Sequence, residues 1–317
     1  MRYITFFILL ATLLPGVDAL AQPKRKNKTR EPEPQGDVFT LRYKPQVGTL
    51  YYDVQTTISH NIENKFVFPI KSVAQLALET KDVDHKSQLW TYDYFFRELK
   101  TILSKYQIPH GEKDSVLNEV RAIGKKSRVT YSMLGKQVSF HAMDTSRLSG
   151  EAQFFSFFFQ PPRLLAPLPE KKASYGTTWE DARRDTVRFL DTLGIEQFAN
   201  GYSIYDLKYV YKFERLQDTV DGSVAVISSQ QTGSFKGVQF NTTGDEIFYE
   251  APITGSDTTY LDLLTGRVLY RDTHYSMPVI VKAAGREQTS DILDIRSIVM
   301  LNIANIRTTA APDGKAR

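Results

Sequence analysis

The feature that most constrains this chain is an alternation of apolar and polar residues, which recurs in short segments between residues 38 and 303. It is clearest over residues 128–141, where two alternating arms flank Leu134-Gly135-Lys136. A period of two places every second side chain on one face of a β-strand, and glycine permits the positive φ of a tight turn. The pattern predicts a β-hairpin here and half-buried strands elsewhere.

Segments of the same kind are joined mostly by short polar turns, which is typical of an antiparallel meander. Pro69 interrupts one of them and predicts an edge or a bulge, because proline cannot donate a ladder hydrogen bond. Short helices are expected near residues 150–160 and 185–193. We therefore expect a mainly β (α+β) fold, a curved antiparallel meander sheet or half-open barrel of roughly ten strands, with a few short helices on the concave face.

Residues 38–308 are expected to form a single β-rich domain, followed by a disordered tail at 309–317. A weak internal repeat relates Gly48-Thr49 to Gly176-Thr177, and the turn at Gly135 to the turn at Gly266. This repeat predicts that the domain consists of two related meanders, 38–148 and 170–308. Chance is the alternative explanation, since glycine is common in turns.

Residues 1–21 have the pattern of a signal peptide. Arg2 is followed by an apolar run at 4–14, and Ala19-Leu20-Ala21 provides small residues at both recognition positions before a cut. An uncleaved anchor is the alternative. The chain contains no cysteine, so it lacks the residue that carries the acyl chains of a lipoprotein. We expect export to the periplasm or cell exterior, with no lipoprotein anchor and no transmembrane segment in the mature chain.

A basic, proline-containing arm is expected at residues 22–37. The stretch from Lys24 to Arg30 is rich in positive charge, and Pro32 and Pro34 disfavour regular structure. The arm is either a contact for an anionic surface or a solvated spacer. The formal net charge of the whole chain is only +4, which together with export argues against a nucleic-acid partner.

The residues suggest no catalytic chemistry. None of the five histidines is spaced for a shared metal, and no Gly-x-Ser-x-Gly or phosphate-binding loop occurs. We therefore expect a protein that is not an enzyme and has no metal or cofactor. A hydrolase with a dispersed acidic site is the remaining enzymatic alternative, because paired carboxylates cannot be chosen from sequence alone.

An unusual cluster of phenylalanines lies in the middle of the chain. No single helix or strand face can bury all of these rings against one partner. They are either a plug that fills the concave side of the sheet, or the lining of a site for an apolar ligand. The predicted ligand-binding residues are Phe154, Phe155, Phe157, Phe158, Phe159, Leu164 and Leu165.

Three short motifs resemble secreted, uncharacterised proteins of Bacteroidetes-type bacteria. These are the opening at 41–52 with Gly48, the segment from Pro167 to Trp179, and the hairpin at 262–269 with Thr265-Gly266. Such families are similar in strand layout to the lipoprotein-carrier (LolA/LppX-like) fold, a half-open barrel in which helices cover a hydrophobic cavity. The resemblance implies a lipid-binding scaffold and carries over no catalytic residue.

The expected function is therefore that of a non-enzymatic cell-envelope protein that binds an apolar or amphipathic ligand, such as a lipid. The alternative is a structural or protein-interaction domain of the periplasm or cell surface, whose aromatic residues are ordinary core and which takes no small ligand.

Overall fold

Long antiparallel strands dominate the computed structural model, which describes residues 37–45, 47–62, 65–103, 115–118, 123–142, 164–188, 201–219, 222–240, 245–283 and 286–302. Within these residues there are twelve strands and no helix. In chain order they are β1 (Thr49–Ile62), β2 (Lys65–Asp84), β3 (Leu89–Leu103), β4 (Ser115–Asn118), β5 (Ser127–Ser132), β6 (Gln137–Ala142), β7 (Thr178–Arg188), β8 (Tyr202–Thr219), β9 (Gly222–Phe240), β10 (Glu246–Asp262), β11 (Arg267–Ala283) and β12 (Arg286–Leu301).

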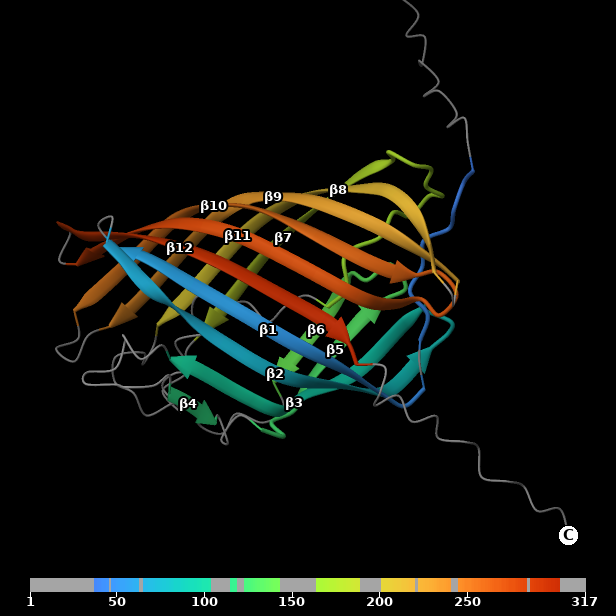
Figure 1. The fold of residues 1–317 in the computed structure, drawn as a ribbon, viewed down its shortest axis with the longest axis horizontal. Helices are drawn as coiled ribbons and strands as arrows, with labels where there is room; N and C mark the ends of the chain where they lie inside the picture. The colour runs from blue at the N-terminus through green and yellow to red at the C-terminus, as the bar shows by residue number, and fades with distance from the viewer. Residues whose placement is uncertain are drawn as a thin grey trace, which may run out of the picture. The chain divides into compact units, whose positions relative to one another are not determined.

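The strands form one curved sheet in the order β6-β5-β3-β2-β1-β12-β11-β10-β9-β8-β7, and β4 pairs with β3 outside this path. Figure 1 shows β1, β2 and β9–β12 in front, with β5, β6 and β7 behind them. β6 and β7 are the two ends of the order and do not pair with each other, so the sheet is not closed into a barrel. The prediction of a curved antiparallel sheet is confirmed.

The first and last strands in the sequence, β1 and β12, lie side by side in the sheet. β1 pairs with β12 from Tyr52↔Leu301 to Ile62↔Asp291. This ladder joins two groups of strands, β1–β6 and β7–β12. Within each group, neighbouring strands are antiparallel. The two groups correspond to the two halves that the internal repeat suggested, and they share one continuous sheet.

Of two local expectations, one is confirmed and one needs correction. Pro69 precedes the β2–β3 ladder, which begins at Lys71, so on that side it has no partner strand among the described residues, as at an edge. The bulge that proline predicted does occur, since the β1–β2 register shifts between Ile58 and His60, opposite residues 67–70. The prediction of a helix at 185–193 is wrong for residues 185–188, because these residues continue β7 and pair with β8. Residues 189–193 and 150–160 lie outside the described residues.

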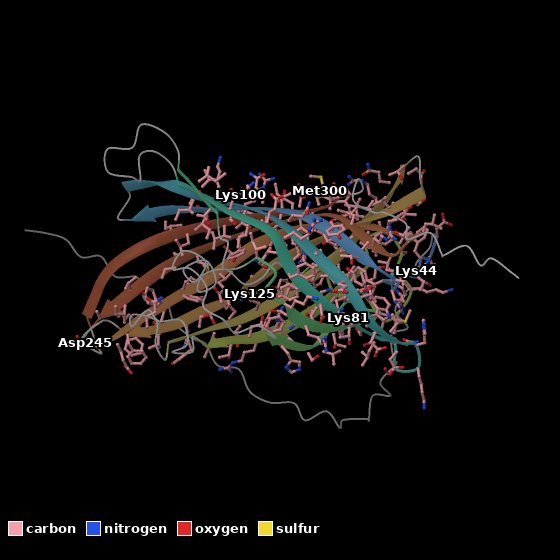
Figure 2. The ribbon with its side chains drawn as sticks, turned by 90° about the horizontal axis from the view of Figure 1, so that it is seen from below. Lys44, Lys81, Lys100, Lys125, Asp245 and Met300 are labelled. Atoms are coloured by element: carbon pink, nitrogen blue, oxygen red, sulfur yellow. The ribbon has the colours of Figure 1, made fainter. Side chains whose placement is uncertain are left out.

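The period of two separates an inner from an outer face along each strand. On β8, Leu207, Tyr209, Tyr211 and Phe213 are buried, while the residues between them are exposed. The same alternation continues on β1 and β12, and the buried residues of the inner face form the core. Three of the residues labelled in Figure 2 are exposed on the other face: Lys81, Lys100 and Met300.

One end of the sheet is covered by two chain segments, 37–45 and 164–177. Phe39 and Ala173 exchange backbone hydrogen bonds, and the backbone N–H of Leu168 donates to Leu134. The hydroxyl of Tyr43 donates to the carbonyl of Ala166 at 2.8 Å. We call this the capped end; Figure 2 shows Lys44 here and Asp245 at the opposite end.

The hairpin turn of β5 and β6 contacts both segments. Gly135 has a φ of 71°, and a Cβ at this position would overlap the Tyr43 ring and lie 2.8 Å from the carbonyl oxygen of Ala166. Gly176 has a similar φ of 81°, but a Cβ there would meet nothing within 4 Å. The two glycines therefore separate the effect of backbone conformation from the effect of close packing.

We expect Gly135→Ala to destabilise the protein more than Gly176→Ala. Both should lose about 1–2 kcal/mol because an L side chain disfavours the left-handed conformation. Gly135→Ala should lose a further amount of about 1–3 kcal/mol because the methyl group overpacks the capped end. Urea unfolding of the two variants measures the difference, and equal losses would show that the contact with Tyr43 is not tight.

Candidate functional site

The described residues place two of the seven predicted ligand-binding residues. Leu164 and Leu165 are buried at the capped end, where they line a cavity of about 20 Å³ together with Tyr52 and Trp90. A space of this size holds about one water molecule. The five phenylalanines from Phe154 to Phe159 lie outside the described residues, so their role stays a prediction.

A row of polar side chains crosses the inner face from β8 to β3. The register links each residue to the next on the adjacent strand, and most of the row is buried. We call these residues the polar row: Tyr211, Ser229, Asp257, Thr273, Ser297, Thr56, Ser72 and Thr101. Period-two patterning alone would place apolar residues at such positions.

An ion pair lies at the middle of this face. Arg271 on β11 and Asp257 on β10 are both almost fully buried, and the carboxylate accepts hydrogen bonds from the Arg271 Nε–H and Nη2–H groups. Thr259 donates to the other carboxylate oxygen at 3.0 Å, and Thr273 donates to the first at 3.2 Å. The buried charges are therefore paired with each other and hydrogen bonded.

Tyrosines surround the ion pair. Burial raises the pKa of Tyr131 and of Tyr209 to about 12, and it raises the pKa of Tyr211 well above the ordinary value. Arg271 acts electrostatically on all three. Burial alone would lower the pKa of Arg271, but the carboxylate of Asp257 keeps that pKa above its usual value. Each tyrosine hydroxyl therefore keeps its proton at neutral pH and can donate a hydrogen bond.

Among the residues that the structure describes, three buried hydroxyls of the inner face have no hydrogen-bond partner. They belong to Ser203 and Tyr211 on β8 and to Ser229 on β9, and all three residues are at most 2 % exposed. An unpaired buried hydroxyl costs about 1–3 kcal/mol. The hydroxyl of Tyr43 differs from these three, because it donates to Ala166. The unpaired groups thus gather on the two strands nearest the β7 edge.

Sequence reasoning did not find the polar row or the ion pair. Thr56, Ser229 and Ser297 each lie at an inward position of an alternating strand, which is the only local signal. Ser and Thr at such positions do not stand out, because they are common on strands. The row becomes visible only when the register places these residues beside one another.

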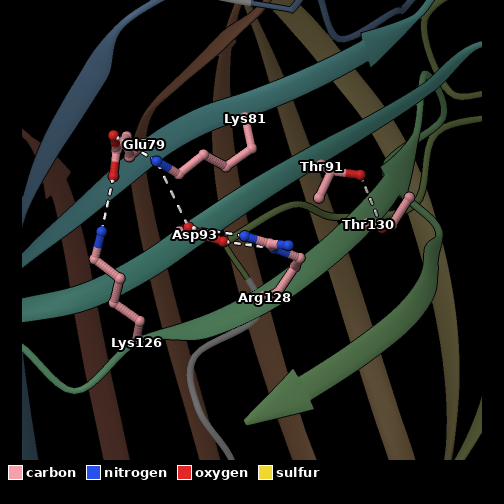
Figure 3. Close-up of polar contacts among 7 residues, drawn as sticks. All are labelled: Glu79, Lys81, Thr91, Asp93, Lys126, Arg128 and Thr130. Atoms are coloured by element: carbon pink, nitrogen blue, oxygen red, sulfur yellow. Dashed lines mark hydrogen bonds and ion pairs between the residues drawn. The ribbon is translucent and has the colours of Figure 1, made fainter. Parts of the chain in front are cut away.

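A second charged cluster lies on the outer face, over β2, β3 and β5 (Figure 3). Arg128 pairs with Asp93 at 2.7 Å, and Lys81 lies 3.7 Å from the same carboxylate. Glu79 contacts Lys81 at 2.7 Å and Lys126 at 3.2 Å. Each carboxylate thus has two cationic partners, and those of Asp93 come from the neighbouring strands β2 and β5, which is typical of a stabilising surface network.

Searches against known proteins do not identify a function for these residues. No family model matches the sequence, and no curated protein matches it significantly. Among the residues described, no group of three or more histidine or carboxylate side chains could hold a metal ion. The same residues include no helix that is long and apolar enough to cross a membrane. The resemblance to lipoprotein carriers remains a prediction.

We expect Arg271→Met to reduce the free energy of unfolding by about 3–5 kcal/mol, because it leaves the Asp257 carboxylate buried without its cation. The double variant Arg271→Met/Asp257→Leu should recover most of this loss, since a buried ion pair can be replaced by apolar residues at little cost. Arg296→Met is the matched control, because Arg296 pairs with Asp272 on the exposed face. Its loss should be much smaller. Chemical unfolding measures the free energy of unfolding of each variant and so checks which variant loses most.

We also expect the Asp93 network to stabilise the protein in a pH-dependent way. Hydrogen bonds from Arg128 are the main cause that holds the pKa of Asp93 below its ordinary value of 3.8. Its folded-state pKa is lowered, so the stabilisation is complete above pH 3.8 and is lost as the pH falls through the folded-state pKa.

Wild-type protein should therefore be more stable than Asp93→Asn at neutral pH, and the difference should disappear in acid. Unfolding of both proteins across the acid range measures it. In an Arg128→Gln background the pH dependence of this difference should shrink. If the stability difference between wild type and Asp93→Asn is constant with pH, the ionised Asp93 carboxylate is not its cause.

Proposed function

We propose that this chain is a non-enzymatic binding protein of the cell envelope, and that it holds an amphipathic ligand such as a lipid against the inner face of its sheet. The observation that carries the proposal is the set of buried hydroxyls of Ser203, Tyr211 and Ser229, which have no protein partner. A bound molecule with a polar group could supply the missing hydrogen bonds.

The surroundings of these hydroxyls favour a ligand that is also apolar. Tyr205, Phe235 and Ile253 are buried on the inner face on one side of the polar row. Met277 and Leu293 continue this apolar surface on β11 and β12. A chain of methylene groups gains favourable transfer free energy on such a surface, about 0.8 kcal/mol for each buried CH₂.

The gap in the pairing between β6 and β7 supports an entry route. Phe140 on β6 pairs with Val129, whose side chain belongs to the core, and it stacks on Tyr94 with 5.9 Å between ring centroids. It nevertheless remains 42 % exposed. An exposed aromatic ring at the rim of an apolar interior suits the first contact with a lipid chain. In this proposal, short helices and the phenylalanines 154–159 cover the concave side as in a half-open barrel.

The cellular setting forms part of the same proposal. Export through the signal peptide at 1–21 would place the protein in the periplasm or outside the cell. The arm from Lys24 to Arg30 would then attract anionic lipid headgroups or another anionic surface. This would bring the protein close to a source of ligand.

The alternative is a structural or protein-interaction domain, and the edge strands favour it to some extent. β7 carries the charged residues Glu180, Asp181, Arg183, Arg184, Asp185 and Arg188, which oppose pairing with a further strand. β6 has no Asp, Glu, Lys or Arg, and Val138 on this strand is exposed. A strand of another protein could therefore add to β6.

We expect the protein purified from its source to carry a lipid that native mass spectrometry detects, and the emptied protein to take up a fluorescent fatty acid. Met277→Trp should reduce uptake strongly while the protein stays folded, because the indole occupies ligand space. Met300→Trp is the control, since Met300 is half exposed on the outer face.

Two results would contradict the proposal. Wild-type protein with a clean apo mass and no uptake would favour the interaction domain. Unfolding of Met277→Trp, together with the absence of uptake by the wild type, would show that the inner face is packed core.

A further inference from the structure

The two unpaired hydroxyls of the polar row lie on neighbouring strands. Tyr211 and Ser229 are directly opposite in the β8–β9 register, and Asp257 follows Ser229 in the same row. The Tyr211 ring is stacked on Trp179 and on Tyr209, with centroid separations of 5.7 Å and interplanar angles of 14° and 16°. The stack holds the ring in place, so the hydroxyl oxygen cannot move toward another protein partner without breaking two aromatic contacts.

The charges near the Tyr211 hydroxyl disfavour the binding of an anionic group. Arg271 is the cation that acts on Tyr211, and its guanidinium is already paired with Asp257. Asp257 and Asp181 are the carboxylates that act on the same hydroxyl. One positive charge thus faces two negative ones, in a region where Tyr211, Ser229 and Asp257 are almost completely buried. An anionic headgroup would lose its hydration and gain no free cation.

A cationic headgroup also lacks a suitable partner. A cation binds an aromatic residue over the face of its ring. The Tyr211 ring stacks on Trp179 and on Tyr209 and is fully buried, so its faces are already in contact with the protein and are not open to a cation. The carboxylate of Asp257 is already occupied by Arg271, Thr259 and Thr273.

We infer that the polar end of the ligand is an uncharged hydrogen-bond acceptor, such as the ester group of a neutral lipid, and that the hydroxyls of Tyr211 and Ser229 donate to it. This inference rests on the proposed function and specifies the chemistry of its ligand. Both donors belong to side chains that the fold does not use for any other hydrogen bond, which is the arrangement expected of a site for a polar ligand group.

Calorimetric titration with ligands of equal chain length tests the inference. The set is methyl dodecanoate, dodecanoic acid at mildly alkaline pH, dodecylamine, and dodecane as the reference without a polar group. Methyl dodecanoate should bind most tightly. The ionised acid and the amine should each bind more weakly than the ester, because their charge is buried without a free counter-charge.

Two variants test the residues. Tyr211→Phe and Ser229→Ala remove a hydroxyl but keep the shape of the inner face, and both should fold with unchanged or slightly higher melting temperatures, since no protein hydrogen bond is lost. Each should weaken methyl dodecanoate binding by about threefold to tenfold, the value of one hydrogen bond, and leave dodecane binding unchanged. Tyr260→Phe is the matched control, because Tyr260 contacts Tyr270 on the outer face.

The outcomes separate this inference from the proposed function. If all four ligands bind equally, or if Tyr211→Phe leaves the preference for the ester unchanged, the inference is wrong although the protein still binds amphipathic molecules. If the acid binds best, the site takes an anion and the charge argument fails. If no ligand binds wild-type protein, the proposed function itself is wrong.

Discussion

The ladder between β1 and β12 is the pairing on which the rest of the structure depends. These strands come from opposite ends of the described chain, yet they lie at the centre of the sheet. Their register sets Thr56 opposite Ser297, with the two hydroxyl oxygens 3.3 Å apart. A shift of one residue would turn every inward side chain of one half outward. The polar row can therefore cross the inner face only because this register holds.

The inner face contains two kinds of buried polar group, and they differ in how they are satisfied. Asp257 and Arg271 satisfy each other with help from Thr259 and Thr273. Such a pair adds little net stability compared with well-packed apolar residues of similar volume. Tyr211 and Ser229 have no such partners. A fold that leaves these hydroxyls unpaired loses stability, and sites of this kind are where binding functions are commonly found.

The capped end of the sheet is closed by well-paired polar groups and packed side chains. At the capped end, the segments 37–45 and 164–177 are held by backbone hydrogen bonds, and Trp179 donates its indole N–H to Pro167 at 2.8 Å. Leu164 and Leu165 are core residues here, and the cavity beside them is too small for a lipid chain. A ligand would therefore lie on the part of the inner face that is further from the cap, where Met277 and Phe235 are buried.

Local sequence determined the strands and their turns. The alternation at 128–141 predicted β5 and β6, and Gly135 marked the turn between them, because these signals depend only on neighbouring residues. The segment at 185–188 was misread as helix because its charged residues hide the strand pattern, which becomes clear only from its pairing with Tyr202–Tyr205. Only the tertiary structure decided which strands are neighbours. This choice brings Asp257 to Arg271, and it places Tyr211 opposite Ser229, where neither hydroxyl has a partner. The physical reason is that hydrogen bonds between strands far apart in the sequence bring these side chains together, and no local pattern encodes that pairing.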